Sequence, residues 1–166
     1  MSAQPTPDAA DTALETFLHQ ETDQHRQALD ALLDGLAAPF GRVLDIWERA
    51  VRGGGKLLLF GNGGSAADAQ HIAAELVIRY EVTRPAISAI ALSTDSSALP
   101  AGAHDFGFET VFSRQVEALG RPGDVAVGIS TSGSSPNVFA AVRAARARGV
   151  IAAGLTGANG SELQAL

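Results

Sequence analysis

Apolar residues recur every three or four positions along the first third of the chain, which is the spacing of an amphipathic helix. The pattern predicts one helix over 11–35 and a second helix that follows Pro39. The apolar side of these two helices consists of Leu14, Phe17, Leu18, Leu29, Leu32, Leu33, Val43, Leu44, Ile46, Trp47 and Val51. We expect residues 1–10, which include two prolines, to form a flexible lead-in. Residues 11–52 are then either an oligomer contact or a cover for one face of a sheet, and the sequence favours neither role.

After Gly55 the pattern changes to short apolar runs that alternate with helical stretches. The apolar runs predict four buried strands, at 56–60, 87–92, 124–129 and 151–155. The helical stretches lie at 66–80, 109–119 and 137–148, and Ser161 caps a further helix. This alternation predicts an α/β fold with a doubly wound parallel sheet and right-handed crossovers. In such a sheet, ligands bind beyond the carboxyl ends of the strands.

Composition excludes several classes of function. The 166 residues are enough for one stable domain, and the absence of cysteine excludes disulfides and thiol catalysis. The net charge of −6 argues against a nucleic-acid partner, because phosphate backbones require lysine and arginine. No signal peptide and no apolar stretch of membrane length is visible, so we expect a cytoplasmic protein with no membrane partner. The one lysine, Lys56, precedes a strand rather than following one.

A glycine-rich loop at residues 61–65 (Gly-Asn-Gly-Gly-Ser) joins the first predicted strand to the next helix. Glycines let the backbone approach an anion, and the start of the helix offers free N–H groups with a partial positive charge. Ser65 adds a hydroxyl donor, so the loop predicts a phosphate site. Gly61, Gly63 and Ala66 also fit the dinucleotide fingerprint G-x-G-x-x-A, and an ordinary structural turn is a third interpretation.

A hydroxyl-rich loop at residues 130–135 (Ser-Thr-Ser-Gly-Ser-Ser) follows the third predicted strand. Ser135 is placed as the N-cap of the next helix and Pro136 as its first residue. Five hydroxyl groups in six residues exceed what a cap requires, so this loop predicts further donors for a sugar phosphate. The alternative is a polar capping loop. A dinucleotide fold has no need of this second loop.

His71, Glu75 and Arg79 are four residues apart and would share one face of the helix over 66–80. The ordinary interpretation of His71 and Glu75 is a surface pair, which Arg79 would steer or join. However, this face begins about 9 Å from the predicted phosphate, within reach of a sugar chain. There Glu75 could act as a general base on a carbon beside a carbonyl, or His71 and Glu75 could hold a divalent metal.

Further motifs complete a series that runs in chain order from about Gly53 to Gly160. The series consists of residues 61–65, Asp68, His71-x-x-x-Glu75, Arg79-Tyr80, 105–108 (Asp-Phe-Gly-Phe), 112–116 (Phe-Ser-Arg-Gln-Val) and 128–133 (Gly-Ile-Ser-Thr-Ser-Gly). It resembles the phosphoheptose isomerases of the SIS (sugar isomerase) domain family. The resemblance implies a flavodoxin-like three-layer sandwich after two helices, with residues 53–166 as the domain that binds the sugar phosphate. Family members continue with another strand and a C-terminal helix, and we expect this domain to lack both.

The resemblance also implies a reaction. Such enzymes are aldose–ketose isomerases that convert sedoheptulose 7-phosphate into D-glycero-D-manno-heptose 7-phosphate through an enediol, for heptose-containing glycans such as lipopolysaccharide. It implies a homotetramer with sites at subunit contacts, Glu75 as the general base, and zinc held by His71 and Glu75. The implied substrate-binding residues are Asn62, Gly63, Gly64, Ser65, Glu75, His104, Asp105, Ser130, Thr131, Ser132 and Ser135. His104 stands where the family usually has an asparagine.

Two other functions remain open. One branch of the family is a non-catalytic module that binds a sugar phosphate or a partner of the replication-initiator type. That branch tends to lose the carboxylate of the His-x-x-x-Glu motif, so Glu75 favours the enzyme. A fragment of a nucleotide-binding dehydrogenase would need an acidic residue about 20 positions past the glycines. Asp95 lies about 30 positions past Gly64, which is too far, so the sequence disfavours the dehydrogenase fragment.

Overall fold

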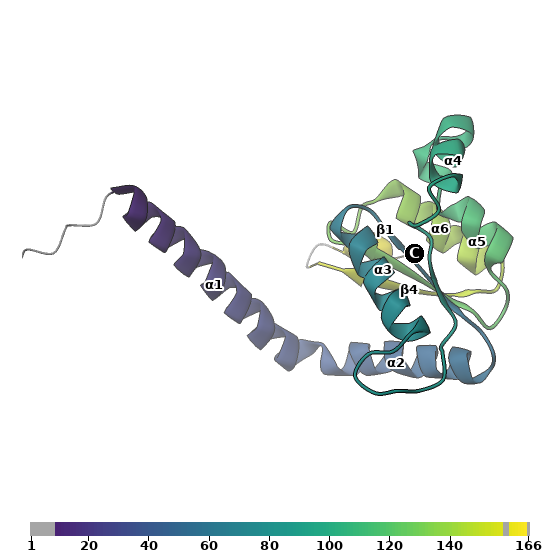
Figure 1. The fold of residues 1–166 in the computed structure, drawn as a ribbon, viewed down its shortest axis with the longest axis horizontal. Coiled ribbons are helices and arrows are strands. Elements are labelled where there is room, and N and C mark those ends of the chain that lie inside the picture. Colours follow the sequence, from purple (N-terminus) through teal and green to yellow (C-terminus); the bar gives the residue numbers. More distant parts are fainter. Residues whose placement is uncertain (1–8, 158–159, 166) are drawn as a thin grey trace, which may run out of the picture. The chain divides into compact units, whose positions relative to one another are not determined.

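The computed structural model describes residues 9–157 and 160–165 (Figure 1). The chain forms two compact units, one that ends at Val43 and one that begins at Leu44. Helix α1 (Ala9–Gly35) and the start of α2 (Ala37–Arg52) belong to the first unit. The rest of α2 and every described strand belong to the second unit. None of the described helices is both long and apolar enough to cross a membrane.

The first unit is helical, as the apolar spacing predicts. Helix α1 begins at Ala9, two residues earlier than expected, and residues 1–8 of the predicted lead-in lie outside the described residues. Pro39 lies in the first turn of α2, where its missing N–H costs no helical hydrogen bond. The apolar side chains of Leu14, Phe17, Leu18, Leu29 and Leu32 on α1 are exposed in the single chain. The expected oligomer contact over 11–52 stays a prediction.

The second unit is built on a parallel sheet with the order β2-β1-β3-β4. Its strands are β1 (Leu57–Gly61), β2 (Ala89–Ala91), β3 (Val125–Ser130) and β4 (Ile151–Thr156). Between them the chain forms α3 (Gly64–Val77), α4 (Ala98–Phe106), the 3-10 turn η1 (Phe108–Thr110), α5 (Ser113–Leu119) and α6 (Pro136–Ala147), and α7 (Ser161–Gln164) follows β4. From β1 the chain moves outward to β2, whereas from β3 it moves outward in the opposite direction to β4. The loops after β1 and β3 therefore diverge from a topological switch point, where doubly wound sheets bind ligands.

Helices cover both faces of this sheet, which confirms the predicted three-layer sandwich (Figure 1). Leu57 and Leu59 of β1 pack on one face against α3 and the second half of α2. Leu58 and Phe60 point to the other face and pack against α5 and α6. All four side chains are fully buried. Burial on both faces explains why β1 is a continuous apolar run rather than an alternating one.

The helices of the structure depart from the prediction at several places. Helix α2 begins at Ala37 and not after Pro39. The helix predicted over 66–80 begins at Gly64 and ends at Val77, so Arg79 lies beyond it. The helix predicted over 109–119 is divided into η1 and α5. Helix α4 is not predicted by the pattern at all.

Local hydrogen bonds explain the unpredicted helix α4. Oδ1 of Asp95 accepts hydrogen bonds from the N–H groups of Ser97 and Ala98, at 2.9 and 2.8 Å. These bonds hold the pKa of Asp95 below its ordinary value and satisfy donors at the start of the helix. Pro100 lies in the first turn of α4, where proline is tolerated, so it does not prevent the helix.

Candidate active site

The glycine-rich loop after β1 is shaped by its neighbours. A Cβ atom on Gly61 would lie 2.7 Å from the carbonyl oxygen of Ile129 and 2.7 Å from Cβ of Ser65, so only glycine fits there. Gly63 has a φ of +57° and precedes the first turn of α3. The N–H of Ser65 donates to the carbonyl oxygen of Asn62 at 3.0 Å. This turn carries Ser65 to the start of α3, next to the end of β3.

The hydroxyl-rich loop after β3 is partly closed by its own hydrogen bonds. Ser135 is the N-cap residue and Pro136 begins α6, as predicted, but the Ser135 hydroxyl does not cap the helix. It lies 2.9 Å from Oγ of Ser130, which also accepts from the N–H of Gly133. Oγ of Ser132 accepts from the hydroxyl of Ser134 at 3.0 Å. Thr131 lies between these pairs, exposed at the end of β3.

A pair of asparagine amides joins the two loops. The side chains of Asn62 and Asn137 exchange two hydrogen bonds, of 2.9 and 2.8 Å. Asn137, in the first turn of α6, is buried. Sequence reasoning missed Asn137 because its importance depends on β1 and β3 being neighbours, which the alternation of strands and helices does not specify.

His71 and Glu75 lie on the exposed side of α3. Nε2 of His71 is 3.2 Å from Oε1 of Glu75, and their side chains are 73% and 36% exposed. The predicted role of Arg79 beside Glu75 is wrong. Because α3 ends at Val77, the Arg79 guanidinium instead donates to the carbonyl oxygens of Tyr80 and Glu81.

Arg84 takes the place near Glu75 that Arg79 was expected to fill. Its guanidinium donates to the backbone carbonyl oxygens of Glu75 and Leu76, at 2.7 and 2.9 Å. These carbonyls belong to the last turn of α3, whose oxygens have no partner within the helix. Arg84 therefore stabilises the end of α3 and does not contact the Glu75 carboxylate.

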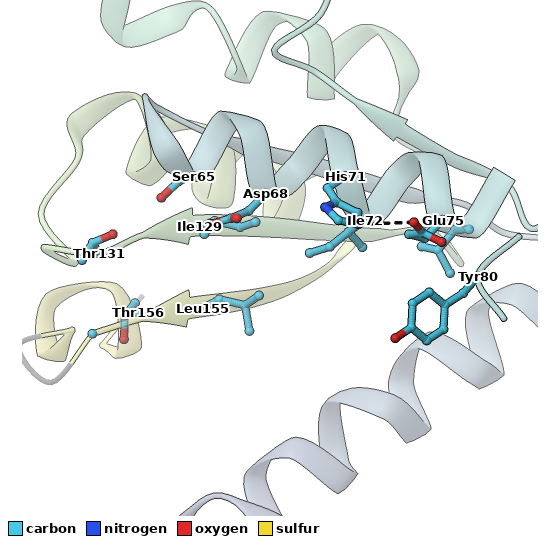
Figure 2. Close-up of a pocket in the computed structure, with 12 residues that line it drawn as sticks. Ser65, Asp68, His71, Ile72, Glu75, Tyr80, Ile129, Thr131, Leu155 and Thr156 are labelled. Carbon is cyan, nitrogen blue, oxygen red and sulfur yellow. Dashed lines mark ion pairs between the residues drawn. The ribbon is translucent and has the colours of Figure 1, made fainter. Parts of the chain in front are cut away.

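A pocket of about 650 Å³ runs along α3 over the ends of β3 and β4 (Figure 2). This volume is in the range of small-molecule sites. The residues that line it are Ser65, Asp68, His71, Ile72, Glu75, Leu76, Tyr80, Ile129, Thr131, Leu155, Thr156 and Gly157. The pocket thus brings together four of the predicted site residues, Ser65, His71, Glu75 and Thr131. Asp68, Tyr80 and Thr156 were not among those predictions, although Asp68 lies three residues before His71 on the same helix face.

Other predicted site residues lie beside this pocket or away from it. Asn62, Gly63 and Gly64 form the first loop, and Ser130, Ser132 and Ser135 belong to the second loop, but none of the six lines the pocket. His104 and Asp105 lie on α4, which packs against the core on the α5 and α6 side of the sheet. Their exposed side chains contact each other, with Nδ1 of His104 2.8 Å from Oδ1 of Asp105.

Lys56 lies at the opposite end of the sheet. Its ammonium group is 2.6 Å from Oδ2 of Asp124, and its backbone N–H donates to Oδ1 of the same residue. This pair lies where β1 and β3 begin, whereas the two loops follow the points where these strands end. The single lysine therefore has a structural partner remote from the pocket.

The sequence and the fold match known proteins. Residues 21–157 match a family model described as SIS domain. A phosphoheptose isomerase of Paramagnetospirillum magneticum is 54% identical over 151 residues, which cover 91% of this chain and 79% of the relative. Solved phosphoheptose isomerases from Neisseria gonorrhoeae (42% identity, TM-score 0.86) and Francisella tularensis (32% identity, TM-score 0.88) each match 92% of this chain and 80% of their own. These matches confirm the resemblance and the fold that the sequence predicts.

Proposed function

The chain belongs to the SIS domain family, and on this premise we propose that it interconverts sedoheptulose 7-phosphate and D-glycero-D-manno-heptose 7-phosphate. Its relatives named phosphoheptose isomerases support this reaction class. The proposal assigns phosphate binding to the two loops and proton transfer to Glu75.

The pocket is the observation that carries the proposal. The hydroxyl-bearing residues Ser65, Thr131 and Thr156 line one part of it, and the His71–Glu75 pair lies farther along α3 (Figure 2). Because the Glu75 carboxylate contacts His71, it lies near the level of His71, about 9 Å along the helix axis from Ser65. A sugar phosphate held by the hydroxyl groups would extend along α3 toward the carboxylate.

Glu75 is positioned to move a proton between neighbouring carbons. In the proposed reaction, its carboxylate removes a proton from C-1 of the ketose to give an enediol, and the same carboxyl group returns a proton to C-2. A proton moves from the oxygen on C-1 to the oxygen on C-2, so that the carbonyl changes position without any net oxidation. His71 orients the Glu75 carboxylate through the 3.2 Å contact.

The phosphate would be bound without a cationic side chain from the two loops. The start of α3 supplies backbone N–H groups with a partial positive charge, and Ser65 and Thr131 add hydroxyl donors. In the proposal, Asn62, Gly63 and Gly64 shape the first loop, and Ser130, Ser132 and Ser135 shape the second.

Zinc is a further part of the proposal. The 3.2 Å between Nε2 of His71 and Oε1 of Glu75 is close to the roughly 3.3 Å between two ligands in a tetrahedral site with bonds of about 2.0 Å. The pair therefore fits two ligand positions. Within residues 9–157 and 160–165, no group of three histidine, cysteine, aspartate or glutamate side chains forms a fuller site. When bound, zinc would polarise the sugar carbonyl.

Metal analysis tests the zinc assignment separately from activity. The protein is equilibrated with zinc, passed over a desalting column and measured by mass spectrometry for bound metal. The proposal predicts bound zinc in the parent and a clear loss in His71→Ala. Equal metal content in the two proteins would show that His71 is not a ligand.

A homotetramer would explain the position of His104 and Asp105. Both are exposed on α4, away from the pocket of their own chain. In a tetramer with sites at subunit contacts, they could reach the pocket of a neighbouring copy. The proposal also keeps the expected cytoplasmic location and the role in heptose-containing glycans of the lipopolysaccharide type.

The decisive assay follows conversion of sedoheptulose 7-phosphate by the parent, by Glu75→Gln and by Glu48→Gln. Glu48 is a matched control because it is also a helical carboxylate in an exposed i, i+4 pair, with Arg52. We expect the Glu75 variant to lose about 10²- to 10⁴-fold in kcat, the usual contribution of a general base, and the control to retain parent activity. A parent that binds the sugar phosphate without converting it would favour the non-catalytic module.

A further inference from the structure

The two loops are joined by a closed ring of hydrogen bonds between asparagine amides. Nδ2 of Asn62 donates to Oδ1 of Asn137 at 2.9 Å, and Nδ2 of Asn137 donates to Oδ1 of Asn62 at 2.8 Å. Asn137 is only 3% exposed. A buried amide that loses its partner pays the full cost of desolvation, so this reciprocal arrangement is strongly favoured over a broken one.

Each asparagine lies close in the sequence to a pocket residue that carries a hydroxyl group, and local backbone structure connects the two. The carbonyl oxygen of Asn62 accepts the N–H of Ser65, so the position of Asn62 sets the start of α3 and the Ser65 side chain. On the other side, Asn137 follows the loop that presents Thr131, and this loop is braced by the contact between Ser130 and Ser135. Ser65 and Thr131 both line the pocket (Figure 2).

The two loops also leave from strand ends that are paired with each other, Gly61 of β1 with Ile129 of β3. Gly61 lies so close to Ile129 and Ser65 that it has no room for a Cβ atom. The pairing of Gly61 with Ile129 fixes the distance between the two strand ends, and the amide pair limits how far the loops separate beyond them. Together these contacts fix the spacing of the two loops.

We propose that Asn137 is a positioning residue, which acts through Asn62 to hold Ser65 and Thr131 at the separation that binds one phosphate group. Asn137 does not itself line the pocket. The identity of the sugar rests on the proposed function. The amide pair of Asn62 and Asn137, called the clamp below, can be tested by the binding of inorganic phosphate alone.

The test measures phosphate affinity by calorimetry in the parent, in Asn137→Ala and in Val142→Ala. Val142 is a buried core residue of the same helix, so its truncation weakens the packing of α6 on the core without touching the amides. We expect Asn137→Ala to bind phosphate about tenfold more weakly or worse, because misplaced binding groups lose much of their effect. Val142→Ala should lower the melting temperature and keep parent affinity. Parent affinity in folded Asn137→Ala, or an equal loss in both variants, would overturn the proposal.

A second variant restores the clamp by pH. In Asn137→Asp, the ionised carboxylate has no proton to donate to Oδ1 of Asn62, but the protonated carboxyl group has one. Burial raises the pKa of an introduced carboxyl group, which brings its protonation toward mildly acidic pH. We expect weaker phosphate binding than in the parent at pH 8 and a smaller deficit at pH 5. A deficit of the same size at both pH values, or none at pH 8, would contradict the proposal.

Turnover of the sugar phosphate separates this inference from the proposed function. A parent that binds phosphate but does not isomerise the sugar would remove the proposed function and leave the clamp intact. If the parent isomerises the sugar and Asn137→Ala has the same KM and phosphate affinity as the parent, the inference about Asn137 is wrong and the proposed function stands.

Discussion

Two of the ion pairs in the second unit, Lys56–Asp124 and His71–Glu75, differ in their surroundings. Asp124 is 3% exposed and accepts hydrogen bonds from the ammonium and backbone N–H of Lys56 and from the N–H of Arg121. Burial raises the pKa of Asp124, but these hydrogen bonds outweigh burial and hold its pKa below the ordinary value. Glu75 has a single histidine contact and lines an open pocket. The acceptor positions of Asp124 are therefore occupied by structural hydrogen bonds. The Glu75 carboxylate keeps acceptor positions that a ligand could use.

This contrast separates stability from activity. The Lys56–Asp124 pair joins the starts of β1 and β3, so breaking it should destabilise the sheet without changing the geometry of the pocket. In the His71–Glu75 pair, the His71 side chain is largely exposed and the Glu75 side chain is partly exposed. Breaking this pair should therefore affect the reaction and leave stability nearly unchanged. Opposite effects of the two pairs on these two quantities would support the assignment of the pocket as the site.

The largest effect is expected from Glu75→Gln. We expect kcat/KM for the sugar phosphate to fall about 10²- to 10⁴-fold, because the variant lacks the carboxylate proposed as the general base. The free energy of unfolding, measured by urea denaturation, should change by less than about 0.5 kcal/mol, as is usual for exposed positions. A large loss of stability would show that Glu75 has a structural role like that of Asp124, and this would contradict the contrast between the two pairs.

The next effect is expected from Asp124→Ala, which should reverse that pattern. Removal of the carboxylate leaves the Lys56 ammonium and the N–H groups of Lys56 and Arg121 without their acceptor. We expect a loss of about 3 kcal/mol in the free energy of unfolding, measured with urea, and kcat/KM within about twofold of the parent where the variant is folded. Asp124→Asn is the milder control, since it keeps one side-chain oxygen acceptor. A specific loss of activity without a loss of stability would contradict the structural role.

A smaller effect concerns the pH dependence of stability. Because the pKa of Asp124 is held below its ordinary value of 3.8, the stabilisation from the Lys56 pair is complete above that value and is lost as pH falls through the lowered pKa. We expect the difference in unfolding free energy between parent and Asp124→Asn to shrink at acidic pH. Urea titrations from pH 3 to pH 7 measure it, and a difference that grows on acidification would contradict the sign.

The smallest effect is expected from Arg84→Ala. Loss of the guanidinium leaves the carbonyl oxygen of Glu75 without its donor, whereas the carbonyl oxygen of Leu76 keeps the N–H of Ile87. We expect a cost of about 1 kcal/mol in unfolding free energy. Because Arg84 contacts the backbone and not the carboxylate of Glu75, kcat/KM should change by only a few-fold. Thermal melts and steady-state kinetics check the two values. A loss of activity as large as that of Glu75→Gln would show that Arg84 acts in the reaction itself.

Most of the fold follows from local patterns in the sequence. Continuous apolar runs mark strands that are buried on both faces, and the glycine-rich and hydroxyl-rich loops mark the carboxyl ends of β1 and β3. Helix α4 was missed because no apolar pattern marks it, and its start depends on the hydrogen bonds of Asp95. Pro100 does not prevent this helix because it lies in the first turn. The end of α3 was misplaced by three residues, and this error moved Arg79 onto the wrong face.

The site itself is less predictable because its contacts join distant segments. Lys56 and Asp124 are 68 residues apart in the sequence, and Asn62 and Asn137 are 75 apart. Both pairs depend on β1 lying beside β3, which is a property of the strand order. Helical spacing alone was enough for His71 and Glu75, since they are four residues apart on α3.

Isomerisation in heavy water tests the central claim most directly. If Glu75 moves a proton through an enediol, the carboxyl group exchanges its proton with solvent, and deuterium should appear at C-2 of the heptose 7-phosphate formed from sedoheptulose 7-phosphate. Magnetic resonance spectra of the product detect this label, and Glu75→Gln should remove both conversion and labelling. Conversion by the parent with no deuterium in the product, or labelling that persists in Glu75→Gln, would contradict the account.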